Sequence, residues 1–386
     1  MRNVYLDNNA STQVAPEVIE AMLPFFRDLW GNPSSMHYFG GQVARHVEHA
    51  RAQVAALIGA DPSEIVFTSC GTESDNTAVR GSVEAMGRAA RVITSRVEHL
   101  AVLGPCHRLK EDGHEVVELG VDASGQVDLA EVRKAVAGGP CVASFMWANN
   151  ETGVVFPIEE IAETVKGAGS VMHTDAVQVA GKLPIDVRKV PVDLLSISGH
   201  KLHAPKGIGA LYIRKGTKIK PFMIGGHQEH NRRGGTENVP YIVGFGRACE
   251  LALSHLGAEV ERIAALRDRL EKGLLTVCAD STVNGDRKNR LPNTTNISFQ
   301  YIEGEAILYH LSDLGVAASS GSACTSGSLE PSHVIRAMGV PFTAAHGSIR
   351  FSFSRYNTDE DVDYVLKHMP PIVERLRRLS PFIKSS

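Results

Sequence analysis

The chain contains the stretch Val192-Asp-Leu-Leu-Ser-Ile-Ser-Gly-His-Lys-Leu-His-Ala-Pro-Lys-Gly-Ile-Gly209, in which an apolar run gives way to small and polar residues before a lysine. Residues 192–197 predict a buried β-strand that ends near Ser198. Lys201 is therefore expected at a strand end. A lysine partly removed from water there can hold its amine uncharged, the form that makes a Schiff base with a carbonyl cofactor. Taken alone, the motif more often marks an exposed lysine in a loop, so its chemistry depends on residues elsewhere.

Short apolar runs alternate with helical segments on both sides of this stretch. The runs are Ile65–Thr68, Val92–Thr94, Val116–Leu119, Val142–Met146, Val171–Thr174, Leu194–Ile197 and Ala210–Ile213. This alternation predicts an α/β protein with a mainly parallel seven-stranded sheet covered by helices on both faces. Ligands of such sheets bind beyond the carboxyl ends of the strands, so polar residues at those ends are the candidates for function.

Length and composition narrow the class of protein. The chain has 386 residues, 43% hydrophobic and 22% charged, with a net charge of -3, which favours a soluble, cytoplasmic protein of two domains. The polar start at Met1–Asp7 gives no secretory signal, and neither a nucleic acid nor a membrane is expected as a partner. The six cysteines are far apart, which argues against a disulfide framework and against a metal site, and favours a reducing compartment.

Periodicity suggests how the two domains are divided. Apolar residues at helical spacing predict a helix over 43–57 that Gly59 can close, and a long helix over about 237–275 that bridges the domains. Two more helices are expected to start near Thr358 and Pro371. We assign residues 16–257 to a large domain, and residues 1–15 and 258–386 to a smaller α+β domain that carries a cysteine loop at about 319–333.

Polar clusters follow the predicted strands. Ser69–Asn76 is a turn of glycine and hydroxyl residues that opens a helix, and its backbone amides can bind a phosphate, although an ordinary capped helix start has the same pattern. His99, Asn150 and Asp175 follow three other strands. A carboxylate, a lysine and a phosphate turn are the set that pyridoxal 5'-phosphate requires, because the carboxylate keeps the pyridine nitrogen protonated.

Long ordered motifs over nearly the whole chain resemble those of the cysteine desulfurases, which have the pyridoxal phosphate-dependent fold type I of the class-V aminotransferases. The likeness is greatest to their nitrogen-fixation (NifS) branch. The matching segments are Val4–Asn9, Phe67–Ser74, Met146–Gly153, Gly199–Lys206 and Ser319–His333. The resemblance implies a homodimeric sulfurtransferase that converts L-cysteine to L-alanine, with an iron–sulfur scaffold protein as the sulfur acceptor and nitrogenase as the favoured destination.

The resemblance also assigns roles. It implies that Lys201 binds the cofactor covalently, that Cys324 takes the sulfur as a persulfide, and that His99 stacks on the cofactor ring and can assist proton transfer. Asp175 would pair with the ring nitrogen. Further cofactor contacts would come from Gly71, Thr72, Asn150, Gln178, Ser198 and His200, with Thr236 from the partner subunit, and substrate contacts from Arg350 and Asn32.

The segment that carries Thr236 raises two further points. Its glycine pairs, at 225–226 and 234–235, bracket a polar, basic stretch with little to bury, so we expect it to need a ligand or partner subunit to order it. At position 230 the chain departs from the family pattern, with His230 where the family has an arginine. The anion-binding role of that arginine is therefore not carried over.

Cys324 differs from the other cysteines in its setting among serines, glycines and threonines, which cannot form a packed core. Such a loop can bring a thiol to a substrate and carry sulfur away, although a lone cysteine in such a loop is often inert. Two alternatives remain at this point. One is a selenocysteine lyase or aminotransferase of the same fold, and the other is a non-catalytic sulfur carrier, whose clustered cysteines the chain lacks.

Overall fold

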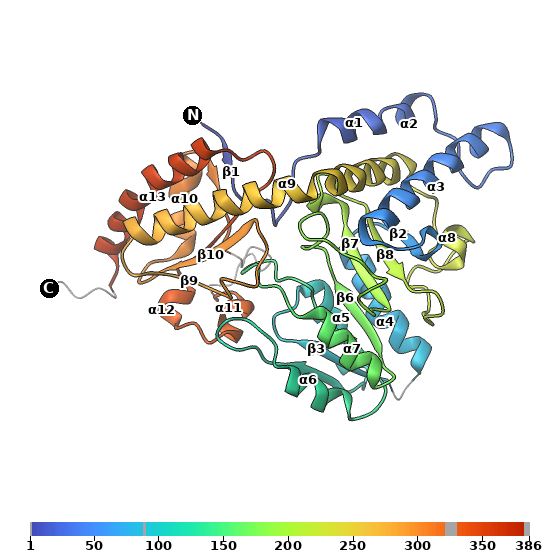
Figure 1. The fold of residues 1–386 in the computed structure, drawn as a ribbon, viewed down its shortest axis with the longest axis horizontal. Helices are drawn as coiled ribbons and strands as arrows, with labels where there is room; N and C mark the ends of the chain where they lie inside the picture. The colour runs from blue at the N-terminus through green and yellow to red at the C-terminus, as the bar shows by residue number, and fades with distance from the viewer. Residues whose placement is uncertain (1, 88–89, 321–329, 382–386) are drawn as a thin grey trace.

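A seven-stranded sheet forms the centre of the computed structural model, which describes residues 2–87, 90–320 and 330–381 (Figure 1). Its strand order is β2-β8-β7-β6-β5-β3-β4, and β8 alone runs against its neighbours. The strands are β2 (Ile65–Thr68), β3 (Arg91–Ser95), β4 (Val116–Leu119), β5 (Cys141–Ser144), β6 (Val171–Asp175), β7 (Leu194–Ser198) and β8 (Gly209–Ile213). The predicted mainly parallel sheet is confirmed, because each predicted apolar run falls on one of these strands.

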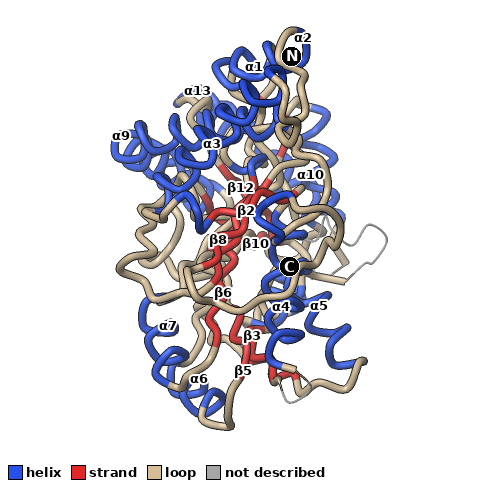
Figure 2. The backbone as a smooth tube through the Cα atoms, turned by 90° about the vertical axis from the view of Figure 1, so that its right-hand side faces the viewer, coloured by secondary structure: helices blue, strands red, loops and turns tan. Residues whose placement is uncertain are grey.

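Helices cover both faces of this sheet, as Figure 2 shows for α4 and α5 on one side and α6 and α7 on the other. Their bounds are α4 (Gly71–Met86), α5 (Leu100–Glu111), α6 (Leu129–Val136) and α7 (Ile158–Gly167). Alternate residues of a strand point to opposite faces. Val142 of β5 accordingly packs in the cluster with α4 and α5, whereas its neighbours Cys141 and Ala143 pack in the large core on the other face.

One long helix, α9 (Val239–Val277), runs from the large core to a second core, as Figure 1 shows. Near the large core it packs against α1 (Pro16–Met22) and α3 (Tyr38–Ile58), and α2 (Pro24–Arg27) lies between these two in sequence. Gly59 ends α3 with a φ of 70°, the left-handed conformation that glycine adopts most easily. The expected helix over 43–57 and its glycine stop are therefore confirmed.

The second core lies around an antiparallel sheet of order β12-β10-β9, and includes apolar residues from the far half of α9. A separate parallel pair joins the N-terminal strand β1 to β11. The bounds are β1 (Val4–Tyr5), β9 (Ser281–Val283), β10 (Thr294–Phe299), β11 (Val316–Ala317), β12 (Ser348–Ser352), α10 (Gly304–Asp313), α11 (His333–Ala337), α12 (Phe342–Ala345) and α13 (Asp359–Leu379). The division at residues 257 and 258 stays a proposal, because α9 runs through that point without a break.

The expectation of a separate helix starting at Pro371 is wrong, because α13 continues through Pro370 and Pro371 to Leu379. Its apolar face explains the continuity, since Val365, Met369 and Ile372 are all buried in the second core. Tertiary burial of this face outweighs the hydrogen bonds that the prolines remove. No helix in the described part of the chain is long and apolar enough to cross a membrane.

A buried ion pair holds the segment before α9 against the sheet. Arg51 of α3 donates from Nη1 to Glu229 Oε2 at 2.7 Å and from Nη2 to Glu229 Oε1 at 3.0 Å, and Phe67 N of β2 donates to the same carboxylate at 2.9 Å. Glu229 lies in the short helix α8 (Gln228–Asn231), where Glu229, His230 and Asn231 have φ values of 47°, 57° and 65°. This left-handed backbone is strained in residues other than glycine, so we infer that the ion pair helps to maintain it.

We expect Glu229→Ala to lower the free energy of unfolding by about 3–5 kcal/mol, because it leaves the Arg51 guanidinium buried without its counter-charge. Urea unfolding of the cofactor-free protein measures the change. The control is Glu48→Gln, which removes the other carboxylate bonded to Arg51; Glu48 is 60% exposed, and its loss should cost less than about 1 kcal/mol. Equal effects of the two substitutions would contradict the importance of the buried pair.

Candidate active site

A cavity of about 300 Å³ lies beyond the carboxyl ends of the central strands. It brings together most of the residues that the sequence nominated. Those that line it are Gly71, Thr72, His99, Asn150, Asp175, Gln178, Ser198, His200, Lys201 and Arg350. Because the lining comes from both the large sheet and β12, the cavity lies where the two cores meet.

Lys201 follows β7 at the end of the 3-10 turn η2 (Gly199–Lys201). Gly199 is required in this turn, since a Cβ there would lie only 2.7 Å from the Ile208 side chain. The Lys201 amine donates to the backbone carbonyls of Asn9 at 2.5 Å and of Ala10 at 2.8 Å. The turn therefore directs the Lys201 amine to the edge of the cavity that is formed by the N-terminal arm, residues 1–15.

The N-terminus of α4 offers a site for an anion. Cys70 precedes this helix in an extended conformation and provides no side-chain cap, so the first backbone amides of the helix are not capped by it. Ser198 Oγ is buried beside them and has no hydrogen-bond partner among the described residues. A Cβ on Gly71 would lie 2.9 Å from Val177 Cγ2, so glycine is needed for this close approach. An orphaned hydroxyl beside a helix N-terminus fits a phosphate group.

Asp175 ends β6 and is buried, with Oδ1 accepting a hydrogen bond from Val177 N at 2.8 Å. Burial raises its pKa, and the nearby charge of Lys201 opposes that rise. A protonated nitrogen of a bound ring would supply the missing positive partner. The position of Asp175 therefore fits the pyridine end of pyridoxal phosphate.

A second carboxylate, Asp75, lines the same cavity and was not among the predicted site residues. Asp75 is buried, and its Oδ1 has no hydrogen-bond partner within the described ranges. Burial and the charge of Asp175 both raise the pKa of Asp75, and a hydrogen bond with Ser196 opposes the rise. The signal in the sequence was its spacing, because Asp75 lies one helical turn after Thr72 and shares its face of α4.

His99 precedes α5 and caps it, since its Nδ1 accepts a hydrogen bond from Ala101 N at 3.1 Å. This contact places the ring proton on Nε2. Burial, followed by the charges of Lys201 and His333, lowers the pKa of His99 to about 4. At neutral pH the cavity therefore contains a neutral imidazole, which suits stacking on a ring and donation from Nε2.

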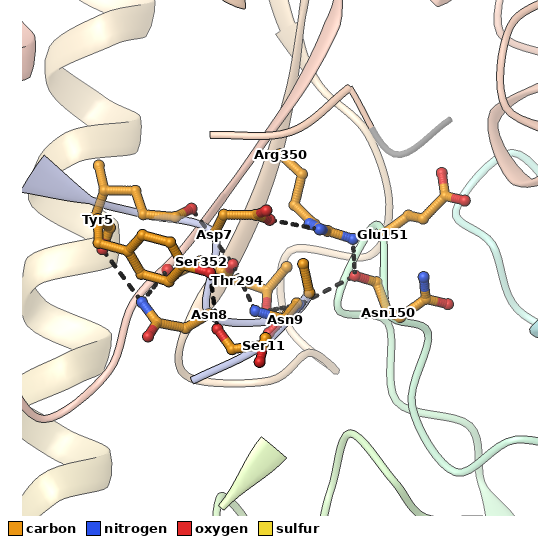
Figure 3. A network of polar contacts seen from close by, with 12 residues as sticks. Tyr5, Asp7, Asn8, Asn9, Ser11, Asn150, Glu151, Thr294, Arg350 and Ser352 are labelled. Atoms are coloured by element: carbon orange, nitrogen blue, oxygen red, sulfur yellow. Dashed lines mark hydrogen bonds and ion pairs between the residues drawn. The ribbon is translucent and has the colours of Figure 1, made fainter. Parts of the chain in front are cut away.

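Arg350 of β12 is almost fully buried and is held by two contacts, which Figure 3 shows. Its Nη2 donates to Asp7 Oδ1 at 2.7 Å, and its Nη1 donates to the Asn150 carbonyl at 3.0 Å. Its Nε has no hydrogen-bond partner among the residues that the structure describes. A guanidinium with spare donor capacity at the cavity wall is suited to binding a carboxylate.

Two nominated residues do not line this cavity. Asn32 and Thr236 are exposed, and the Asn32 side chain accepts a hydrogen bond from Ser34 N at 2.9 Å. Cys324 lies outside the described residues. His230, where the chain departs from the family pattern, is exposed in the left-handed turn.

Contacts within the chain hold part of the segment around residues 225–236, and its expected need for a ligand or partner subunit stays a prediction. Arg233 forms a two-pronged ion pair with Glu73 of α4 at 2.8 and 3.1 Å, and Arg232 donates to the Ser63 carbonyl at 3.0 Å. Together with the pair between Arg51 and Glu229, these contacts hold the part of the segment from residue 229 to residue 233. Polar and ionic contacts with distant parts of the chain hold this part of the segment in place of buried apolar side chains. Composition alone does not reveal such contacts.

Among the described residues, no group of three or more histidine, cysteine, aspartate or glutamate side chains is placed so that it could hold a metal ion. The described cysteines are all free thiols. Cys141 and Cys278 are buried core residues. Cys70 is the described cysteine that lines the cavity.

Comparisons with known proteins agree with this geometry. Residues 4–365 match the class-V aminotransferase family. The cysteine desulfurase of Trichormus azollae is 58% identical over 99% of this chain and 96% of its own length, and the cysteine desulfurase NifS of Azotobacter vinelandii is 55% identical over 99% and 95%. A solved structure of a NifS-like protein superimposes with a TM-score of 0.91 at 40% identity, covering 97% of this chain and 100% of that one. The chain therefore belongs to the class-V aminotransferase family, within its cysteine desulfurases of the NifS type.

Proposed function

We propose that the chain is a pyridoxal phosphate-dependent cysteine desulfurase that converts L-cysteine to L-alanine and transfers the sulfur to Cys324 as a persulfide. The observation that carries the proposal is the convergence of three groups on one cavity. These are the Lys201 amine, the buried Asp175 carboxylate and the Ser198 hydroxyl at the end of β7, which lies beside the start of α4 and has no hydrogen-bond partner among the described residues. Each group matches a different end of the cofactor, and the family relationship supports the same chemistry.

Different residues of the cavity would hold different parts of the cofactor. Gly71, Thr72, Ser198 and His200 would hold its phosphate, Asp175 its ring nitrogen, His99 one ring face, and Asn150 and Gln178 its ring hydroxyl region. When bound, pyridoxal phosphate supplies a carbonyl that binds amines and a ring that accepts electrons. The cavity of about 300 Å³ lies at the lower end of the range for small-molecule sites.

Lys201 is the residue best placed to move a proton. Its amine lies against the carbonyls of Asn9 and Ala10, which accept its hydrogens and hold it at the cavity edge. From there Lys201 can take the Cα proton of the substrate and return a proton later. His99 can assist as a donor through Nε2, because its low pKa keeps the ring neutral.

Arg350 would bind the substrate carboxylate. Its Nη2 is bonded to Asp7 in the substrate-free chain, so a substrate carboxylate has to share or replace that partner. The bound cysteine would thereby be oriented by its carboxylate on the side of β12 and by its amine on the side of Lys201. Asn32 does not line the cavity of the single chain, and we propose it as a second residue that contacts the substrate.

The transfer of sulfur requires no external oxidant. The Cys324 thiolate attacks the sulfur of the substrate, a sulfur–sulfur bond forms, and the carbon–sulfur bond breaks. The electron pair of the broken bond remains with the substrate carbon and takes up a proton to complete alanine. The products are one alanine and one Cys324 persulfide, which we propose supplies a scaffold protein for iron–sulfur cluster assembly, with nitrogenase as the favoured destination, in the cytoplasm.

A homodimer is supported by large apolar side chains that the single chain leaves exposed. Trp30 is 69% exposed and stacks on Phe39 with ring centroids 5.8 Å apart, and Ile224 is 91% exposed. Exposed aromatic and aliphatic groups of this size are typical of protein interfaces. Thr236 is also exposed, which allows it to complete the phosphate site of a partner chain, as we propose.

Two substitutions separate the proposed chemical steps. Lys201→Ala should abolish the borohydride-reducible adduct with pyridoxal phosphate. Cys324→Ala should retain that adduct and its yellow colour but form alanine roughly a hundredfold or more slowly, because it lacks the sulfur acceptor. Absorbance and alanine release measure the two effects. If alanine formation survives in Cys324→Ala and is lost in Cys70→Ala, the acceptor is Cys70 and the assignment fails.

For Arg350→Lys we expect the KM for cysteine to rise roughly tenfold to a hundredfold with an unchanged cofactor spectrum, because lysine keeps the charge but loses the planar fork. Steady-state kinetics measure the change. The matched control is Arg290→Lys, which alters another buried guanidinium whose carboxylate partner, Glu271, lies outside the cavity. An unchanged KM in Arg350→Lys would remove Arg350 from the substrate site.

A shared site predicts complementation between inactive chains. We expect Thr236→Glu to be inactive, because its carboxylate would repel the cofactor phosphate, and Lys201→Ala to be inactive for lack of the amine. A mixed dimer should contain one site with both lesions and one site with neither. Activity should therefore return after subunit exchange, whereas continued inactivity of verified mixed dimers would mean that each chain builds its site alone.

A further inference from the structure

Lys182 lies behind the proposed cofactor site and has no assigned role. It follows Gly181 in the turns after β6 and lines a second cavity of about 40 Å³, separate from the one that contains Asp175. Lys201 lines both cavities and therefore lies between them. Because Lys182 does not line the larger cavity, it cannot contact a ligand there, and any effect by contact has to pass through another residue.

That residue is Gln178. The Lys182 amine donates to the Gln178 side-chain oxygen Oε1 at 3.2 Å and to the Gln178 backbone carbonyl at 3.0 Å. On its other side, Gln178 Nε2 donates to the Asn9 carbonyl at 3.0 Å, the same oxygen that accepts from Lys201 at 2.5 Å. The amide of Gln178 is thus placed between an ammonium group and a carbonyl oxygen.

The hydrogen-bonding roles of its two neighbours permit only one orientation of the Gln178 side-chain amide. An ammonium group only donates hydrogen bonds and a carbonyl oxygen only accepts them. A rotated amide would place its NH₂ group against Lys182 and its oxygen against Asn9, so that both hydrogen bonds would be lost. Since Gln178 lines the larger cavity and Nε2 has a second hydrogen, the preferred orientation offers a donor to that cavity.

We propose that Lys182 is a positioning residue that holds the Gln178 amide with its NH₂ group, and not its oxygen, available to the ligand. The cavity then prefers a ligand with an anionic oxygen at this position. This inference rests on the proposed function, in which that oxygen is the ring hydroxyl of pyridoxal phosphate.

Several charged groups surround Lys182 and define how it responds to pH. Burial, followed by the charges of Lys201 and Arg350, lowers the pKa of Lys182 to about 7. His203, Glu259 and Arg355 line the same small cavity. As the pH rises through about 7, Lys182 loses its charge and its hold on Gln178 Oε1 weakens, so the preference for an anionic oxygen should weaken too.

The test follows the absorbance of the adduct between Lys201 and pyridoxal phosphate as a function of pH, without substrate. A donor to the ring oxygen favours its ionised form and lowers the midpoint pH at which the adduct loses its proton. Lys182→Met should therefore raise this midpoint by roughly 0.5–1 pH unit, whereas Lys182→Arg, which still donates, should stay near the wild-type value. No shift in Lys182→Met would overturn the proposal.

A double-mutant cycle separates positioning from the bare charge of Lys182. In a Gln178→Met background there is no amide to position. Adding Lys182→Met to that background should therefore shift the midpoint pH much less than Lys182→Met does in the wild-type chain. Fully additive shifts would show that Lys182 acts by its charge, and would overturn the proposal.

Two further measurements cover the cases in which Lys182→Met does not fold or the wild-type chain does not bind the cofactor. If Lys182→Met does not fold, Gln178→Glu replaces the donor with a carboxylate while keeping Lys182, and it should bind pyridoxal phosphate at least about tenfold more weakly. Wild-type affinity in Gln178→Glu would overturn the proposal. A wild-type chain that forms no borohydride-reducible adduct would instead refute the proposed function itself.

Discussion

The carbonyl oxygen of Asn9 accepts hydrogen bonds from both Lys201 and Gln178, and the rest of the site depends on where that oxygen is held. The Asn9 side chain fixes it, donating to Thr294 Oγ1 at 2.8 Å and to the Asn150 carbonyl at 3.0 Å, as Figure 3 shows. Thr294 belongs to the sheet of the second core. The N-terminal arm therefore joins that sheet to the reactive lysine, which explains why a site at the edge of one core requires the other.

Buried charge is the second constraint on the site. Burial raises the pKa of Glu98 to about 8 and that of Glu151 to about 7, even though Ser95 and Ser332 donate to them. Arg350 keeps the Asp7 carboxylate as its partner in the cofactor-free chain, so a substrate carboxylate has to share or replace that partner. A ring proton would complete the pair with Asp175. The proposed ligands would therefore rearrange the charge pairing of the site.

Much of this arrangement could be predicted from the sequence. The strands were found from their apolar runs, and His99, Asp175 and Lys201 were nominated because parallel strands end at the same edge of a sheet. Asp75 and Lys182 were missed because neither follows a strand directly: Asp75 lies one helical turn after Thr72 in α4, and Lys182 contacts Gln178, four residues before it. The separate helix at Pro371 was wrongly predicted for a related reason, since local proline chemistry was weighed without the apolar face that the second core covers.

The same contacts explain why only one of three neighbouring lysines is suited to bind the cofactor. Lys206 is exposed and does not line the cavity. Lys182 is closer, but its amine is bonded to two oxygens of Gln178 and lines only the smaller cavity. Lys201 alone among them lies at the strand end with its amine at the edge of the larger cavity. The contacts that tie Lys182 to Gln178 therefore keep its amine out of the larger cavity, and Lys201 is left as the amine that can meet a carbonyl there.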